Sequence, residues 1–170
     1  MHRDEIERYL RQVGAYLDEQ ALIGEILILG GAYMTLVLQK REVTMDVDAY
    51  FAVNAAAIRE AAARVAEEHR LPPDWLNDAV KGFLYVEPEA TPWLECPGLR
   101  VYAPPPEYIF AMKAVAGRPG DLRDLEALRD TLGLTAASQA LEIVARYVPT
   151  RLLTPRLRYL VEGLFDQEQD

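Results

Sequence analysis

Apolar residues recur along the chain at spacings that predict both helices and strands. Ile6, Leu10, Val13 and Leu17 fall on one face of a helix, with charged residues between them, so a helix is expected over 4–18. Capping residues, prolines and glycines delimit the other expected helices. They are expected over 32–38, from Asn54 to His69, from a start within 104–107 to Gly117, from Asp121 to about Thr131, near 136–147 and near 154–164.

Short apolar runs rich in β-branched and aromatic residues predict the strands. They are expected over 25–29, 44–53, 83–86 and 99–102. Strands thus lie mainly in the first 102 residues and helices dominate afterwards, which indicates an α+β fold: a small mixed β-sheet with flanking helices and a helical C-terminal part. The length predicts a single domain over 1–170, divided into an α/β core over 1–104 and a helical part over 105–170.

Composition and charge narrow the class of protein. The chain is 51% apolar and 26% charged, which suffices to bury a core and excludes general disorder. A net charge of −9 disfavours broad electrostatic binding to nucleic acid, although a metal ion can still bring a nucleotide to such a surface. Cys96 is the only cysteine, so neither an intramolecular disulfide nor a cysteine-based zinc cluster is expected.

The apolar segments do not have the pattern of a targeting or membrane-spanning sequence. The N-terminal residues contain no apolar stretch of the signal-peptide type. The longest apolar stretch, 21–38, is interrupted by Glu25 and by Gly30-Gly31, which favours a strand, a turn and a helix over a membrane span. We therefore expect a cytoplasmic protein with no membrane partner.

Two features around this stretch carry candidate chemistry. Asp46 and Asp48 are two residues apart in an expected strand, so their side chains share one face with Cα atoms about 6.6 Å apart. Two such carboxylates repel each other unless a cation lies between them, and Mg²⁺ prefers oxygen ligands of this kind together with phosphates. Gly30-Gly31 follows an expected strand and precedes an expected helix, where a backbone without side chains can approach a phosphate.

These residues, in this order, resemble the signature of the DNA polymerase beta nucleotidyltransferase superfamily. That signature is a strand, a Gly-Gly or Gly-Ser turn, a helix, and two acidic residues one apart on the next strand. The spacing Arg41-x-x-Thr44-x-Asp46-x-Asp48 is most similar to the minimal bacterial and archaeal branch, which includes the toxins of abortive-infection toxin–antitoxin systems. A second stretch, 113–124, also resembles that branch, whose members carry a lysine, an arginine and one or two aspartates there.

The resemblance implies a nucleotidyltransferase fold and a function. The protein would move a nucleoside monophosphate from a nucleoside triphosphate to a hydroxyl of a protein, a tRNA or other RNA, or a small molecule, and it could be a toxin with an antitoxin partner. The implied roles are Mg²⁺ or Mn²⁺ binding by Asp46 and Asp48, triphosphate binding by Gly30, Gly31, Lys113 and Arg118, and a further catalytic carboxylate from Asp121 or Asp124.

The chain also departs from the family pattern, which leaves alternatives open. Many active members have a serine where this chain has Gly31, and the third strand carboxylate of the superfamily has no clear match beyond Glu87 or the 121–124 pair. Asp121 and Asp124 equally fit the cap and the first turn of a helix, and Lys113 fits a packed helix whose lysine reaches solvent. The alternative function is a catalytically degenerate binding or interaction module. A dinucleotide-binding domain is excluded because a third glycine is missing.

Overall fold

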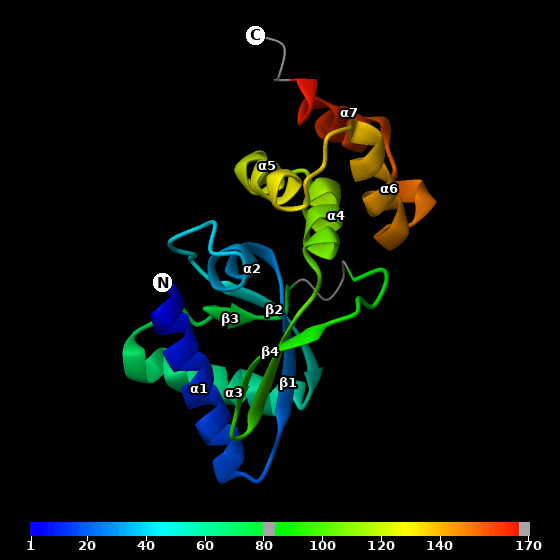
Figure 1. The fold of residues 1–170 in the computed structure, drawn as a ribbon. Helices are drawn as coiled ribbons and strands as arrows, with labels where there is room; N and C mark the ends of the chain where they lie inside the picture. The colour runs from blue at the N-terminus through cyan, green and yellow to red at the C-terminus, as the bar shows by residue number, and fades with distance from the viewer. Residues whose placement is uncertain (80–83, 167–170) are drawn as a thin grey trace. The chain divides into compact units, whose positions relative to one another are not determined.

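The apolar run before the two glycines forms the central strand of a sheet. The computed structural model of the protein describes residues 1–79 and 84–166 (Figure 1). Strand β1 (Gly24–Ile28) pairs antiparallel with β2 (Val47–Val53) and parallel with β5 (Leu99–Ala103). Strands β3 (Leu76–Asn77) and β4 (Thr91–Cys96) complete a five-stranded sheet in the order β3-β2-β1-β5-β4. The expected α+β class with a mixed sheet is therefore confirmed.

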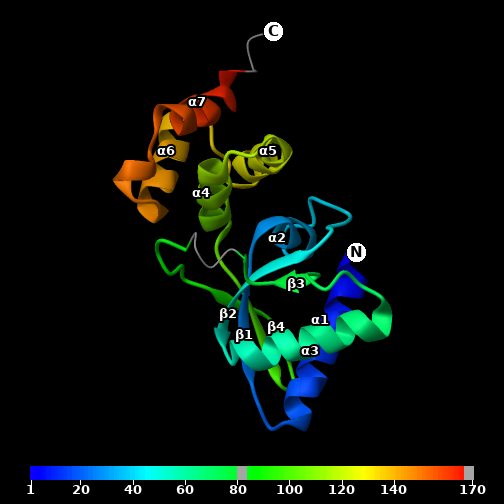
Figure 2. The same ribbon diagram turned by 180° about the vertical axis from the view of Figure 1, so that it is seen from behind.

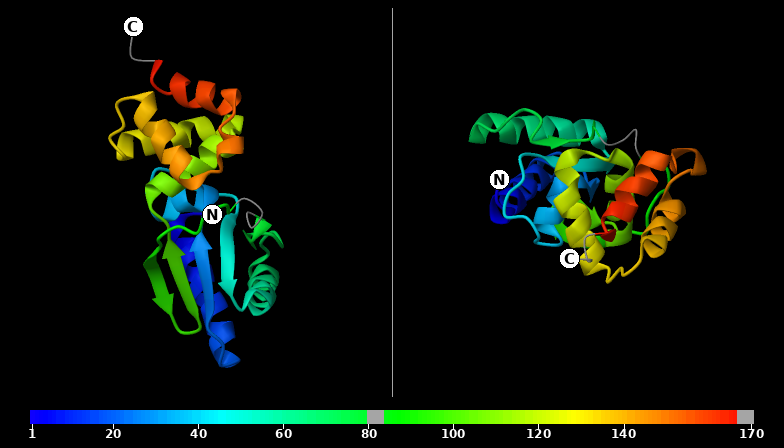
Figure 3. Two further views of the ribbon diagram at one scale, coloured as in Figure 1. Left: turned by 90° about the vertical axis from the view of Figure 1, so that its right-hand side faces the viewer. Right: turned by 90° about the horizontal axis from the view of Figure 1, so that it is seen from above.

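Two long helices cover one face of this sheet. Helices α1 (Arg3–Glu19) and α3 (Ala55–His69) pack against each other, α1 also contacts β5, and α3 also contacts β1 and β2. The left view of Figure 3 looks onto the strands, with α1 behind them. The apolar face of α1 is buried as its spacing predicted; its fully buried members are Ile6, Leu10, Val13 and Leu17. Burial of apolar area between these helices and the strands is the main source of stability here.

Helix α2 (Gly30–Leu36) begins directly after β1, at the two glycines. Its following loop leads back to β2, which runs antiparallel to β1. Helix α2 also packs against β2, so the turn at the end of β1 and the start of β2 lie side by side. This topology gathers the two halves of the candidate motif at one end of the sheet.

Four helices follow the last strand. They are α4 (Pro106–Ala116), α5 (Leu122–Thr131), α6 (Ala137–Tyr147) and α7 (Pro155–Gly163), with single turns of 3₁₀ helix at Pro119–Asp121 and Thr150–Leu152. Helix α4 contacts the other three (Figure 2), because it is apolar over most of its surface. Proline opens α4 and α7, where its missing N–H costs nothing.

The chain divides into two compact units. One comprises Met1–Gly82 and Ala90–Pro104, and the other comprises Phe83–Glu89 and Pro105–Asp170. The division after Pro104 falls where the sequence separates the α/β core from the helical part. The short segment before β4 belongs with the helices, and there the Tyr108 hydroxyl donates to the carbonyl oxygen of Val86 at 3.1 Å. None of the helices in the described part of the chain is both long and apolar enough to cross a membrane.

Several expected elements differ from those observed. The strand over 83–86 is wrong, because residues 84–86 are irregular and Phe83 lies outside the described residues. Strands β3 and β4 were not expected. β2 begins at Val47 instead of residue 44, because the N–H of Thr44 bonds to the Met1 carbonyl oxygen and not to β1. Asn54 precedes α3, but its side chain donates to the Ile23 carbonyl oxygen and does not cap the helix.

Candidate functional site

The glycine turn after β1 packs against the carboxylate of Asp48. Gly30 has a φ of +58°, a left-handed conformation that glycine adopts without strain. A Cβ atom added to Gly30 would lie 2.5 Å from Oδ2 of Asp48. The backbone N–H of Leu29 also donates to the Asp48 carbonyl oxygen at 2.8 Å, which fixes the turn against the start of β2. Glycine at position 30 is thus required both by the backbone and by the carboxylate beside it.

The segment before β2 bounds the other side of the turn. A Cβ atom on Gly31 would lie 3.1 Å from Oγ1 of Thr44 and 3.3 Å from Nη1 of Arg41. The Thr44 side chain is buried, and its hydroxyl donates to the carbonyl oxygen of Asp46 at 3.0 Å. One hydroxyl therefore lies next to both Gly31 and the backbone of Asp46. A serine at position 31 would have to share its space with Thr44.

The two aspartates occupy partly exposed positions that alternate with buried ones. Asp46 immediately precedes β2 and Asp48 is its second residue, while Val47 and Ala49 are fully buried. The N–H of Val47 donates to the Trp75 carbonyl oxygen at 2.6 Å. Among the described residues, no group of three or more His, Cys, Asp or Glu side chains is placed to hold a metal ion. A divalent ion at this position would therefore take its other ligands from a bound phosphate and from water.

The strand neighbour of Asp48 on β3 is an amide, not an acid. In the parallel pairing of β2 with β3, Asp48 lies opposite Asn77, and both are half-buried. The Asn77 side chain is used locally: its Nδ2 donates to the Asp74 carbonyl oxygen at 3.2 Å and its Oδ1 accepts from the Ala79 N–H at 3.1 Å. The sequence did not predict this neighbour, because a two-residue strand has no periodicity to detect. β3 therefore supplies no third carboxylate beside Asp48.

The remaining expected ligands belong to the second unit, where three of them bind one another. Nζ of Lys113, on α4, lies 2.7 Å from Oδ1 of Asp121 and 2.7 Å from Oδ2 of Asp124. Lys113 and Asp124 are buried, with 7% and 3% of their surfaces exposed. Asp121 precedes α5 but makes no side-chain cap bond, since its carboxylate binds the lysine. This cluster joins α4 to the first turn of α5, so Lys113 does not reach solvent.

Two other candidates lie on the surface of the second unit. Arg118 is exposed in the connection between α4 and α5, and its carbonyl oxygen accepts the N–H of Asp121 at 2.9 Å. Glu87, considered for the third carboxylate, is exposed in the irregular segment before β4.

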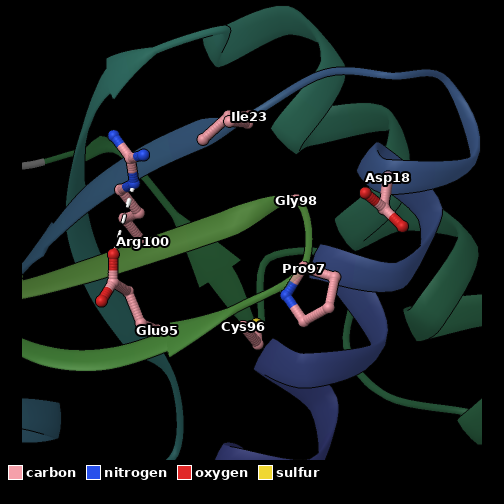
Figure 4. Close-up of a pocket in the computed structure, with 7 residues that line it drawn as sticks. All are labelled: Asp18, Ile23, Glu95, Cys96, Pro97, Gly98 and Arg100. Carbon is pink, nitrogen blue, oxygen red and sulfur yellow. Dashed lines mark ion pairs between the residues drawn. The ribbon is translucent and has the colours of Figure 1, made fainter.

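A shallow cavity of about 400 Å³ lies at the other end of the sheet from Gly30. Figure 4 shows it beside the turn between β4 and β5, with Asp18 of α1 and the side chains of Glu95 and Arg100 at its border. Cys96 also lines it, and burial raises the pKa of this thiol, which argues against a reactive thiolate. The cavity therefore does not coincide with the candidate phosphate site.

Comparisons with models of known protein families, with curated proteins and with solved structures found no match to this chain.

Proposed function

We propose that the protein is a Mg²⁺-dependent nucleotidyltransferase of the DNA polymerase beta type, with its nucleotide site at the Gly30-Gly31 turn. The observation that carries the proposal is the packing of Gly30 against the Asp48 carboxylate. A phosphate and its metal can be bound together only where the turn and the carboxylate lie close to each other, and this proximity supports the proposal beyond the sequence pattern. The function rests on the resemblance for its reaction and on this contact for its location.

The residues at the turn fit a divalent ion held together with a triphosphate. Asp46 and Asp48 provide two carboxylates at partly exposed neighbouring positions, and Mg²⁺ commonly takes one or two carboxylates plus substrate phosphates. Mn²⁺ accepts the same oxygen ligands. When bound, such an ion neutralises charge that develops on the phosphoryl oxygens during transfer. Gly30 and Gly31 let the backbone of the turn lie close to Asp48 and Thr44, and Thr44 holds the Asp46 backbone through its hydroxyl.

The acceptor and the biological setting follow from the resemblance alone. It implies a hydroxyl of a protein, an RNA such as tRNA, or a small molecule as acceptor, and it implies an antitoxin partner if the protein is a toxin. It also assigns phosphate binding to Lys113 and Arg118, and a catalytic carboxylate to Asp121 or Asp124. The ion pairs of Lys113 with both aspartates argue for a structural role of these three residues beside any catalytic one.

A second candidate function is a binding or interaction module that keeps the fold without catalysis. It is favoured by Asn77, which occupies the strand position beside Asp48 and uses its amide within a local turn. A site with two carboxylates could bind a metal–nucleotide complex and still lack the group that activates an acceptor hydroxyl.

Incubation with each labelled nucleoside triphosphate, Mg²⁺ and cell extract tests the first candidate. Label in protein, RNA or a small molecule is expected with the parent chain and not with Asp46→Asn. The matched control is Asp18→Asn, an exposed aspartate at the far end of the sheet, which should retain activity. Absence of label with all four nucleotides would refute the transferase, and retained Mg²⁺–nucleotide binding would then support the module.

Thermal melts separate metal chemistry from architecture at Asp46. Mg²⁺ with nucleotide at a hundredfold excess over Kd should stabilise the parent by about 2.7 kcal/mol. Asp46→Asn should lose this gain but be as stable as the parent without ligand, because the change removes a charge and keeps the shape. A ligand-free variant that is destabilised by about 1–3 kcal/mol, beside a parent indifferent to metal and nucleotide, would make Asp46 a structural residue.

A further inference from the structure

The face of the sheet opposite α1 and α3 carries an aromatic row next to the candidate phosphate site. The antiparallel register pairs Leu27 of β1 with Tyr50 of β2, and the parallel register pairs Leu27 with Tyr102 of β5. Paired residues project to the same face, so the two tyrosines flank Leu27 across three adjacent strands. Leu27 is 8% exposed, whereas both tyrosines are half-buried. The row thus places two partly exposed tyrosines on either side of a buried leucine.

This row begins one side-chain repeat away from the aspartate pair. Tyr50 and Asp48 are two residues apart on β2, so their side chains share a face and their Cα atoms are about 6.6 Å apart. Two strand spacings, about 9.6 Å, separate the backbones that carry the two tyrosines. A planar ring that extends from phosphates held near Asp48 would therefore reach the row without leaving the sheet.

The next row along the same face has the opposite character. Nη1 of Arg100 lies 3.2 Å from Oε1 of Glu25, and its Nε lies 3.5 Å from Oε1 of Glu95. One guanidinium between two carboxylates leaves a net negative charge, which repels phosphate oxygens but tolerates a neutral ring. The charges therefore define a direction on this face, with phosphates at the Asp48 end and uncharged groups toward the tyrosines.

We propose that Tyr50, Leu27 and Tyr102 form the subsite for the base of the nucleotide. The inference rests on the proposed function, since it places the base relative to phosphates bound at the Gly30 turn. Aromatic side chains stack on any base through its π-face, and a phenol hydroxyl can add a hydrogen bond to a base edge. The subsite selects a ligand with a planar ring joined to the phosphates, and not a bare polyphosphate.

Isothermal titration with two probes tests the subsite. Mg²⁺–nucleoside triphosphate carries a base, and Mg²⁺–tripolyphosphate lacks one. The parent should bind the nucleotide more tightly than the tripolyphosphate. Tyr50→Val and Tyr102→Val should weaken nucleotide binding by about 5- to 150-fold, the range for losing one stacking contact, and leave tripolyphosphate binding unchanged. Tyr50→Phe and Tyr102→Phe should keep most of the nucleotide affinity because the ring remains.

The controls make each outcome decisive. Tyr159, which is 75% exposed on α7, provides the matched control Tyr159→Val, which should alter neither affinity. Tripolyphosphate binding by each variant shows that the variant is folded, and the parent's preference for nucleotide is measured without any substitution. Equal affinity of the parent for both probes would overturn the base subsite and leave the phosphate site standing. Variants that lose transfer but keep nucleotide affinity would assign the row to the acceptor and also overturn it. Binding of neither probe would overturn the proposed function together with the subsite.

Discussion

Removal of the Lys113 ammonium should destabilise the protein strongly. Lys113→Met keeps an unbranched apolar stem of similar length but leaves Asp121 and Asp124 without the cation that both contact at 2.7 Å. The side chains of the lysine and the two aspartates are only 8%, 14% and 4% exposed, so water screens little of the resulting repulsion. Loss of one partner from a buried ion pair costs about 3–5 kcal/mol, and we expect a loss in this range.

Urea unfolding followed by two probes measures this effect. With slopes of about 1–3 kcal/mol per molar urea, the expected loss lowers the midpoint by at least about 1 M. Far-UV circular dichroism reports the helices, including those of the second unit. Trp75 and Trp93, the only tryptophans, both belong to the first unit, so their fluorescence reports that unit. The dichroism transition should therefore shift whether or not the fluorescence transition moves with it.

Two further variants serve as controls. One removes an exposed cation, and the other removes the buried carboxylate that Lys113→Met leaves behind. Arg11 pairs with Glu7 at 2.8 Å, but these side chains are 51% and 32% exposed, so Arg11→Met should change stability by less than about 1 kcal/mol. Adding Asp124→Leu to Lys113→Met should regain stability, because it removes a buried charge that has lost its ion pair with Lys113. Lys113→Met as stable as the parent would refute the reasoning. Titration of the folded variant with Mg²⁺–triphosphate separately tests the phosphate contact that the resemblance assigns to Lys113, whose loss should cost about 1.5–3 kcal/mol.

Three other predictions follow from single features. The Tyr16 hydroxyl donates a hydrogen bond to Glu68 and lowers the pKa of that carboxyl below 4.5. The ionised Glu68 therefore stabilises the fold above pH 4.5, and this stabilisation is lost as the pH falls through the lowered pKa. In urea unfolding at several pH values, Glu68→Gln should flatten the dependence of stability on pH. Burial raises the pKa of Tyr108 to about 12, so the neutral phenol stabilises the fold fully below pH 10.0 and this stabilisation is lost as the pH rises through about 12. Tyr108→Phe should remove this late step from the ultraviolet titration. Gly30→Ala and Gly117→Ala both place alanine at a φ near +55°, which costs about 1–2 kcal/mol of stability. Only at position 30 does the new Cβ also meet a carboxylate, so calorimetry should show the larger loss of stability for Gly30→Ala.

Much of the fold could be predicted because its strongest periodicities coincide with its longest elements. The four apolar positions of α1 and the apolar run of β1 match the periods of a helix and of a buried strand, and α4 and α7 each begin at a proline and end at or just before a glycine. The strand at 83–86 failed because local β-propensity cannot distinguish a strand from an irregular segment whose carbonyl oxygen accepts a side-chain donor, as Val86 does from Tyr108. β4 was missed because Pro92 and Glu95 obscure its alternation, and it pairs with β5 across a register shift.

The candidate site was predictable only as far as sequence spacing can place residues. The pattern identified the glycine turn and the aspartates, and the antiparallel pairing of β1 with β2 explains why they meet. Thr44 and Arg41 beside Gly31, Asn77 beside Asp48, and the tyrosines beside Leu27 all depend on tertiary contacts or on pairing between strands distant in sequence. Strand pairing that brings residues 23 to 75 positions apart side by side leaves no local periodicity for sequence analysis to detect.

The two charged clusters also differ in what they leave for a ligand. In the second unit, Lys113 binds both acidic side chains of its cluster, and the remaining negative charge lies at the first turn of the helix they open, which favours it, so all three side chains are used within the protein. In the first unit, a left-handed glycine packs against a partly exposed carboxylate, and a second partly exposed aspartate lies just before it. An arrangement that admits only glycine and leaves its carboxylates accessible contributes little to core packing. Carboxylates that stay partly exposed beside the turn can still take a cation and a phosphate, which favours the glycine turn over the lysine cluster as the candidate ligand site.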